Sequence, residues 1–413
     1  MSEPPASASV HTLLLVRNGV DHDARVLRAA RVAERTFAGS ALVVGVDNGT
    51  GPGPCTVEGV RVQRLALGMP RAARPRAAPG DSGAHAAIGR TARLTLRARA
   101  RRIAGGWSFA LQSIMLARRL KPRLVHANDW NTMWSGLAIK LLCGARLVYD
   151  SHELWPDRNG RWEWRPWLLA SEAIFVRAAD EVITASPGYA DALARRHRIP
   201  RPTVIRNIPE GTPVRLPAPQ TSAVVIYVGG LMPGRGLEQA IDALALAPAV
   251  HLRAVGPGPA AYRAHLLRRA MAAGVGDRLE LAPAVAPSAL PATLAQASAG
   301  LCLIQPVCRS YELTLPNKLF EYAAAGLPIL ASDLPVIGPL VRAAGLGEVV
   351  CPTDPQAIAD GMLRLTEPGA WHTASRRSQA FAQANSWPAE AQALARAYRS
   401  AGSNGAAPAP SPT

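Results

Sequence analysis

A glycine-rich turn lies between an apolar run and a helical pattern in the second half of this sequence. The segment VGGLMPGRGLEQ at 228–239 places Gly230, Gly234 and Arg235 in that turn. Glycines let a backbone approach a ligand closely, and a helix N-terminus offers unpaired N–H groups to an anion. Arg235 adds a cation whose geometry suits phosphate. The pattern predicts a phosphate site, and an ordinary βα turn with a surface arginine is the alternative.

A second candidate site is the segment SYELTLPNKLFEYAAAGLPILASD at 310–333. Pro316 suits the first turn of a helix, and Gly326 suits its C-terminal end. Lys318 and Glu321 are three residues apart and therefore share a helix face. A lysine near a helix start can bind phosphate, and a carboxylate one turn later can accept both hydroxyls of a ribose. The alternative is a Lys–Glu pair on the surface.

Polar side chains also follow the apolar runs of the first half. His152 and Glu153 stand at the end of the run 145–153, and Asp129 ends the run 123–129. Ligands of open parallel sheets bind beyond the carboxyl ends of the strands, and buried polar groups there are costly unless they are paired or functional. His152 is a candidate for binding a sugar hydroxyl or stabilising developing charge. The alternative is a histidine that caps a neighbouring helix.

The first apolar run leads into the turn VRNGVDHDARV at 16–26, with Asn18 and Gly19 at its tip. Asp23 is a plausible N-cap for the helix that follows. The glycine fingerprint G-x-G-x-x-G is absent, which argues against a dinucleotide site and against an oxidoreductase.

Apolar runs of four to six residues alternate with helical patterns along most of the chain, which is typical of βα units and parallel sheets. The sequence therefore predicts two doubly wound α/β domains. The expected boundaries are a disordered tail at 1–9, an N-terminal domain at 10–207 with a basic insertion at 71–103, a linker at 208–220, a C-terminal domain at 221–386, a helix at 387–402 returning to the N-terminal domain, and a disordered tail at 403–413.

The composition limits the class of protein. The 413 residues are 48% hydrophobic and carry a formal charge of +17. That charge favours an anionic partner, although a genome rich in G and C enriches Arg and Ala and explains it equally well. Five scattered cysteines without a C-x-x-C pair fit a reducing cytosol. The sequence shows neither a signal peptide nor an apolar run of bilayer length, so we expect a cytoplasmic protein. It shows no nucleic-acid-binding motif, so we expect no nucleic-acid partner.

Five strings, in family order, resemble retaining glycosyltransferases of the GT-B fold in family 4: VDHDARVLRAA, HANDWN, YDSHELWP, GGLMPGRGLEQAI and LTLPNKLFEYAAAGLPILASD. The resemblance covers about residues 11 to 402. It implies two Rossmann-like domains with the active site in the cleft between them. It also implies transfer of a sugar from a nucleotide-diphosphate sugar to an acceptor hydroxyl with retention.

The resemblance also implies roles for single residues. It gives His152, Arg235 and Lys318 to catalysis. It gives donor binding to Gly19, Gly230, Gly234, Arg235, Leu315, Pro316, Asn317, Lys318 and Glu321, with Glu321 on the ribose. It places Asn18, Asp23, Arg25, Asp129 and Glu153 on the acceptor side. The leaving diphosphate would be stabilised by Arg235, Lys318 and a helix N-terminus. No metal and no other cofactor is expected.

The chain departs from the family pattern at two positions. The first glutamate of the family's E-x7-E string is replaced by Leu313, and Glu312 stands one position away. Gly230 stands where the family has the arginine of a G-R-L string. Both changes remove groups that would touch the donor, so a non-catalytic GT-B protein that binds a sugar nucleotide or a partner protein is the alternative function.

The acceptor is expected to be a saccharide, a lipid-linked molecule or another small molecule. The Arg-rich segment 71–103 and the tryptophans Trp162, Trp164 and Trp167 suggest a surface that sits on anionic lipid at the inner face of the membrane. Such a place would fit envelope polysaccharide or glycolipid assembly. The alternative is a solvated basic loop beside a packed aromatic corner.

Overall fold

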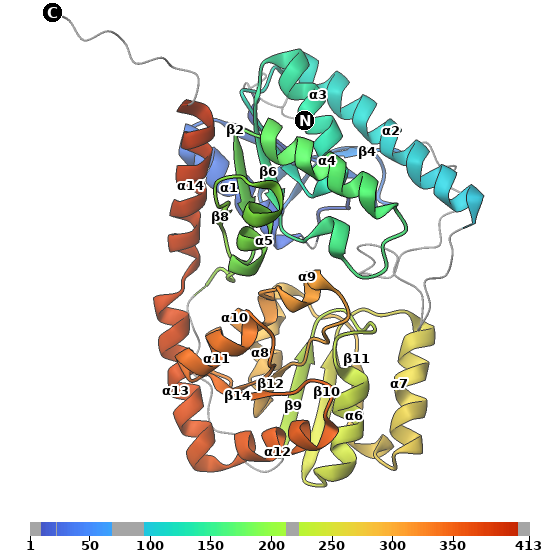
Figure 1. Ribbon diagram of the computed structural model, residues 1–413, viewed down its shortest axis with the longest axis vertical. Coiled ribbons are helices and arrows are strands. Elements are labelled where there is room, and N and C mark those ends of the chain that lie inside the picture. The colour runs from blue at the N-terminus through green and yellow to red at the C-terminus, as the bar shows by residue number, and fades with distance from the viewer. Residues whose placement is uncertain (1–9, 22, 68–94, 212–222, 404–413) are drawn as a thin grey trace, which may run out of the picture.

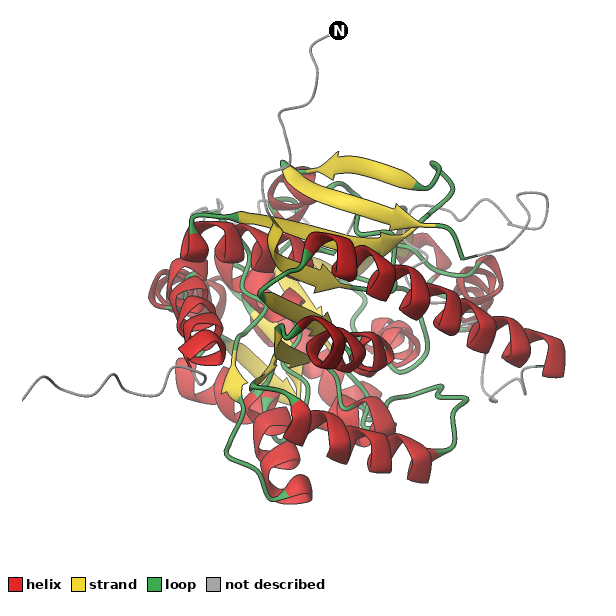
Figure 2. Cartoon of the chain, turned by 90° about the horizontal axis from the view of Figure 1, so that it is seen from above, coloured by secondary structure: helices red, strands yellow, loops and turns green. Residues whose placement is uncertain are grey.

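The computed structural model describes residues 10–21, 23–67, 95–211 and 223–403. These residues form two lobes, each built on its own sheet (Figure 1). Helices flank the strands on both sides when the molecule is seen from above (Figure 2). The two doubly wound sheets confirm the predicted α/β class and the GT-B arrangement.

The first sheet has the strand order β3-β4-β2-β1-β5-β6-β7-β8. Its strands are β1 Val10–Leu15, β2 Ser40–Val46, β3 Gly53–Val57, β4 Val60–Leu65, β5 Leu124–Asn128, β6 Arg146–Ser151, β7 Glu181–Thr184 and β8 Thr203–Val204. All neighbouring pairs are parallel except β3 and β4, which form an antiparallel hairpin at one edge. The central strands are fully buried, as expected of a parallel sheet covered on both faces.

The helices of this lobe are α1 Ala24–Phe37, α2 Leu96–Leu120, α3 Trp130–Cys143, α4 Arg165–Ala178 and α5 Pro187–His197, with the short turn η2 Trp155–Asp157. Asp23 caps α1 as predicted, because its carboxylate accepts the N–H of Val26. Thr95 caps α2 in the same way.

The structure corrects the prediction that residues 71–103 form one basic loop. Residues 96–103 belong to α2, a helix of 25 residues, and residues 71–94 lie outside the described part of the chain. Arginine is a good helix former, so a stretch rich in Arg and Ala extends a helix as readily as it forms a loop. Gly105, Phe109, Ser113 and Ala117 are buried on one stripe of α2, and this contact anchors the helix to the lobe.

The second sheet has the order β11-β10-β9-β12-β13-β14 and is parallel throughout. Its strands are β9 Ala223–Val228, β10 Val250–Val255, β11 Leu279–Ala282, β12 Ala299–Cys302, β13 Ile329–Ser332 and β14 Gly347–Val350. Its helices are α6 Leu237–Leu246, α7 Ala260–Ala272, α8 Leu290–Leu294, α9 Arg309–Glu312, α10 Asn317–Ala324, α11 Ile337–Ala344 and α12 Pro355–Thr366, with the turns η3 Gly276–Arg278 and η4 Pro287–Ala289.

Two final helices, α13 Pro368–Ala384 and α14 Trp387–Ser403, run along one side of both lobes (Figure 1). α13 packs on α10 of the second lobe, and α14 packs on α1 of the first. The buried hydroxyl of Tyr398 on α14 lies 2.7 Å from Nδ1 of His126 on β5. The C-terminal helix therefore crosses back and closes the core of the first lobe.

Candidate active site

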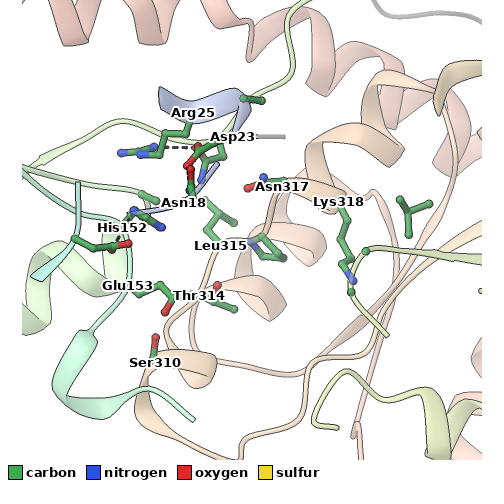
Figure 3. Close-up of a pocket in the computed structure, with 18 of the residues that line it drawn as sticks. Asn18, Asp23, Arg25, His152, Glu153, Ser310, Thr314, Leu315, Asn317 and Lys318 are labelled. Atoms are coloured by element: carbon green, nitrogen blue, oxygen red, sulfur yellow. Dashed lines mark hydrogen bonds and ion pairs between the residues drawn. The ribbon is translucent and has the colours of Figure 1, made fainter. Parts of the chain in front are cut away.

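A cleft of about 900 Å³ lies between the two lobes, at the carboxyl ends of both sheets. Residues of the first lobe face residues of the second across it (Figure 3). The structure brings together Asn18, Gly19, Asp23, Arg25, Asp129, His152, Glu153, Gly230, Arg235, Leu315, Pro316, Asn317, Lys318 and Glu321 around this cleft. Of the residues expected there, only Gly234 does not line it, and it shapes the turn instead.

The turn after β9 is held by glycines with left-handed backbone angles. Gly234 has φ +84°, and an added Cβ would lie 3.2 Å from the ring of Tyr311. Gly236 has φ +80°, and an added Cβ would lie 2.1 Å from the carbonyl oxygen of Leu303. Side chains at these positions would be strained or would clash. The glycines therefore allow the turn to press against the neighbouring strand and present Arg235 to the cleft.

The guanidinium of Arg235 lies 4.5 Å from the ring centroid of Tyr311. It forms no ion pair with any residue in the described ranges, and its one polar contact is the sulfur of Met232 at 4.0 Å. Stacking on the tyrosine fixes the orientation of the cation without neutralising it. Arg235 is therefore free to bind an anion in the cleft.

Lys318 stands in the first turn of α10 and is only 8% exposed. Its ammonium nitrogen has no hydrogen-bond partner among the described residues. Burial, together with nearby Arg235, lowers the pKa of Lys318 to about 7, while Cys302 and Glu321 oppose the shift. A buried cation without a partner is costly, which marks this position as one prepared for an anion.

The first turn of α10 faces the same space. Leu315, Pro316 and Asn317 line the cleft, and no side chain caps the helix (Figure 3). Its first N–H groups and the positive end of its dipole are open to a ligand. One turn later, burial raises the pKa of Glu321, with Lys318 and Arg28 opposing the shift. An anion site and a carboxylate acceptor thus lie side by side on one helix.

His152 and Asp129 form a pair on the opposite wall. Nδ1 of His152 lies 3.2 Å from Oδ1 of Asp129. Burial raises the pKa of the Asp129 carboxyl to about 7, although His152 opposes the shift. Burial alone would lower the pKa of His152, but Asp129 and Asp150 raise it. The 3.2 Å separation places the imidazole beside this carboxylate at the cleft, although neither atom has a hydrogen-bond partner in the described part of the chain. Glu153 follows and also lines the cleft.

Arg25 is engaged on the wall of the cleft. Its guanidinium donates to both carboxylate oxygens of Asp150 at 2.7 and 2.8 Å, and also to the carbonyl of Ile205 and the side chain of Asn207. Nε2 of His126 lies 3.4 Å from the same carboxylate. Burial would raise the pKa of Asp150, but Arg25 and His126 hold it well below its ordinary range. Arg25 therefore links α1 to β6 and to the residues that follow β8.

The loop 16–21 is shaped by its own side chains. Asn18 donates to Asp23 at 2.7 Å and accepts from the N–H of Val20. A Cβ at Gly19 would lie 2.9 Å from Cβ of Asn48, so only glycine fits without a shift. Asp21 and Asp23 have the D-x-D spacing of a carboxylate pair, but Asp21 pairs with Arg64 and Asp23 caps α1. Both carboxylates therefore already interact with other groups of the protein.

The structure explains one departure from the family pattern. Leu313, at the first position of E-x7-E, is buried against Leu154, Tyr189 and Leu193 of the other lobe. Glu312 instead pairs with Arg309 at 2.7 Å on α9 and does not line the cleft. At this position the chain makes an apolar contact between the lobes.

Several lining residues were not singled out from the sequence. They are Arg17, Asp47, Asn48, Tyr189, Asn207, Tyr227, Ser310, Tyr311 and Thr314. Arg17 could have been found, because it is a cation at the end of the first strand. Tyr189 could not, because its hydroxyl reaches the carbonyl of Ser310 at 2.8 Å only when the lobes meet. In the described ranges, no group of three or more His, Cys, Asp or Glu side chains is placed to hold a metal ion.

None of the helices that the structure describes is long and apolar enough to cross a membrane.

Comparison with known proteins gives two family matches that follow one another along the chain. Residues 58–211 match the family described as glycosyltransferase family 4, and residues 222–367 match the family described as glycosyl transferases group 1. A D-inositol 3-phosphate glycosyltransferase from Acidothermus cellulolyticus is 26% identical over 314 residues, which are 67% of this chain and 67% of that protein.

Solved structures share the fold at low identity. Sucrose-phosphate synthase from Thermosynechococcus elongatus superposes with a TM-score of 0.72 at 19% identity, covering 94% of this chain and 98% of that one. Anabaena HepE in complex with UDP and glucose gives a TM-score of 0.67 at 16% identity, covering 94% and 99%. Because the two family matches follow each other across both lobes of a GT-B fold, the chain belongs to the family 4 glycosyltransferases.

Proposed function

We propose that this glycosyltransferase takes its sugar from a nucleotide-diphosphate donor and transfers it to an acceptor hydroxyl with retention at the anomeric carbon. The observation that carries the proposal is the pair Arg235 and Lys318, two cations that line one cleft and pair with no carboxylate among the described residues. A diphosphate supplies the matching negative charge.

Solved relatives support the class of donor. HepE has been seen with UDP-glucose, and an E. coli protein of the same fold has been seen with UDP-2-fluoro glucose, at TM-scores of 0.67 and 0.64. In our proposal the diphosphate binds between Arg235, Lys318 and the first turn of α10. Glu321 then accepts the ribose hydroxyls, and Gly19 and Gly230 let the donor approach the backbone.

Negative charge develops on the leaving diphosphate, and the rate of transfer depends on how well that charge is stabilised. Arg235, Lys318 and the N-terminus of α10 are already oriented, so they stabilise that charge without reorganisation. In our proposal these groups suffice, and neither a metal nor another cofactor takes part. His152, which lies beside Asp129, faces the reacting sugar from the opposite wall. The acceptor lies against Asn18, Asp23 and Glu153 of the first lobe.

We further propose that the acceptor is a saccharide or lipid-linked molecule, and that the reaction serves envelope polysaccharide or glycolipid assembly at the inner face of the membrane. The basic charge of the chain and the exposed tryptophans of the first lobe support this place.

Donor hydrolysis tests the chemistry without knowledge of the acceptor. The protein is incubated with UDP-, GDP-, ADP- and dTDP-sugars in EDTA, and released sugar is followed by NMR. We expect slow hydrolysis of one donor, with release of the sugar in its original anomeric form before mutarotation. Release of the opposite anomer would refute retention, and activity that requires added Mg²⁺ or Mn²⁺ would refute the metal-free route.

A further inference from the structure

Three helices of the first lobe, α2, α3 and α4, lie next to one another on the outside of the sheet (Figure 1). Large apolar side chains are exposed on all three, and Trp107 is 73% exposed. The exposed residues of α2 include Ile103, Trp107, Leu111 and Met115. Trp134 on α3 and Trp167 on α4 are exposed as well. Exposed apolar side chains gathered on neighbouring helices can mark an interaction site.

The exposed residues of α2 form one stripe. Ile103, Trp107, Leu111 and Met115 are spaced by four, while the stripe that begins at Gly105 is buried against the lobe. A helix that already buries one face has no need of a second apolar stripe for folding. On the neighbouring helices, Trp134 and Trp167 stack with ring centroids 5.8 Å apart, which extends the apolar surface beyond α2.

The charges of this face have one sign. α2 carries Arg97, Arg99, Arg101, Arg102, Arg118 and Arg119 and no acidic residue, and none of these arginines forms an ion pair with a described residue. α3 also has no acidic residue. The one acid of α4, Glu172, is fully buried and pairs with Arg196 and His197. The three helices therefore present apolar and cationic side chains and no exposed acidic one.

We infer that the face formed by α2, α3 and α4 binds the surface of an anionic phospholipid bilayer. Tryptophan and leucine side chains enter the headgroup boundary while arginines along the same helix attract the phosphates. A protein partner or a second copy of this chain would satisfy the apolar stripe but would leave six arginines without acidic partners.

Binding of this face to a membrane would also bring the cleft close to the bilayer. Arg17 lines the cleft, and a Cβ at Gly106 of α2 would lie 3.4 Å from its guanidinium. The helix on the membrane thus touches the acceptor wall. If the proposed function holds, a lipid-linked acceptor reaches the site without leaving the bilayer.

Vesicle sedimentation tests the inference with the full chain. Vesicles of phosphatidylcholine containing phosphatidylglycerol are compared with vesicles of phosphatidylcholine alone, at low salt and at high salt. We expect binding to the anionic vesicles that falls steeply with salt, because screening weakens surface attraction. The variant Trp107→Ser/Leu111→Ser should bind at least about tenfold more weakly, since each side chain loses its burial in lipid.

A matched control removes exposed apolar residues elsewhere. Leu267 and Met271 stand on α7 of the second lobe and are also exposed. The variant Leu267→Ser/Met271→Ser should bind vesicles as the wild type does. Equal losses in both variants, or no binding to anionic vesicles, would overturn the inference.

Two further measurements separate the possible failures. Sedimentation equilibrium without lipid reports self-association, and a dimer abolished by Trp107→Ser/Leu111→Ser would identify a second copy as the occupant instead. Donor hydrolysis without vesicles should be unchanged in this variant. If the wild type hydrolyses none of the donors, the proposed function is refuted. The vesicle result would still test membrane binding by itself.

Discussion

The ammonium of Lys318 lies 3.5 Å from the ring centroid of Tyr227 and has no hydrogen-bond partner in the described part of the chain. The aromatic face holds the cation at the donor end of the cleft, but it does not neutralise the charge. Burying this cation without a partner is therefore costly until an anion binds beside it.

Replacing Lys318 with methionine should weaken binding of the nucleotide-diphosphate donor without lowering the melting temperature. A hydrogen bond to a charged group contributes about 1.5–3 kcal/mol, so affinity should fall roughly 10- to 100-fold. Stability should hold because the variant removes an unpaired buried charge. Calorimetric titration measures the affinity, and Lys140→Met, outside the cleft, serves as control. A destabilised variant with full donor affinity would contradict the assignment.

Stability of the free protein should rise with pH above about 7. The folded pKa of Lys318 is about 7, and its unfolded value is 10.5. Between these values the unfolded chain holds one more proton than the folded chain, so the free energy of unfolding increases with pH. Urea unfolding from pH 7 to 9 should show a slope that is more positive in the wild type than in Lys318→Met, by the contribution of this one proton. Donor binding above pH 7 should also take up a proton, measurable in buffers of different ionisation enthalpy.

Glu321→Gln should weaken donor binding, because a neutral amide accepts the ribose hydroxyls less strongly than a carboxylate. We expect a loss of roughly tenfold in affinity. The matched control is Glu312→Gln, since Glu312 pairs with Arg309 and does not line the cleft. If the two variants bind the donor equally well, Glu321 does not contact it.

Arg25→Met should destabilise the first lobe severely. The change leaves the buried carboxylate of Asp150 with only His126 beside it, and breaking such a pair costs about 3–5 kcal/mol. Arg31 on the same helix pairs with the exposed Glu58 and Glu210, so Arg31→Met should cost less than about 1 kcal/mol. Urea unfolding compares the two. Similar stability losses would show that the Arg25 pair is not structural.

The sequence predicted the strands of both sheets well because continuous apolar runs bounded by turns are a local signal. The apolar runs at 123–129 and 145–153 contain β5 and β6. The hairpin of β3 and β4 was missed, since its alternating, half-exposed residues give no such run. The helical start of α2 was also misjudged, because arginine and alanine do not distinguish a loop from a helix.

The residues of the site could be predicted from local patterns, because they follow strands or open helices, but most contacts between distant segments could not. Lys318 and Glu321 share a helix, so their spacing placed them on one face. The pair Arg25 and Asp150 is separated by 125 positions, and only the closed sheet brings the two together. Leu313 shows the same limit, because its packing against Tyr189 depends on how the lobes meet.

The central claim is that one cleft uses Arg235 and Lys318 together to bind a diphosphate. Calorimetric titration of UDP, GDP, ADP and dTDP into the wild type and into Arg235→Met/Lys318→Met tests it directly. We expect at least one nucleotide to bind the wild type, with affinity lower by about 100-fold or more in the double variant. Equal affinity in the two proteins would contradict the account.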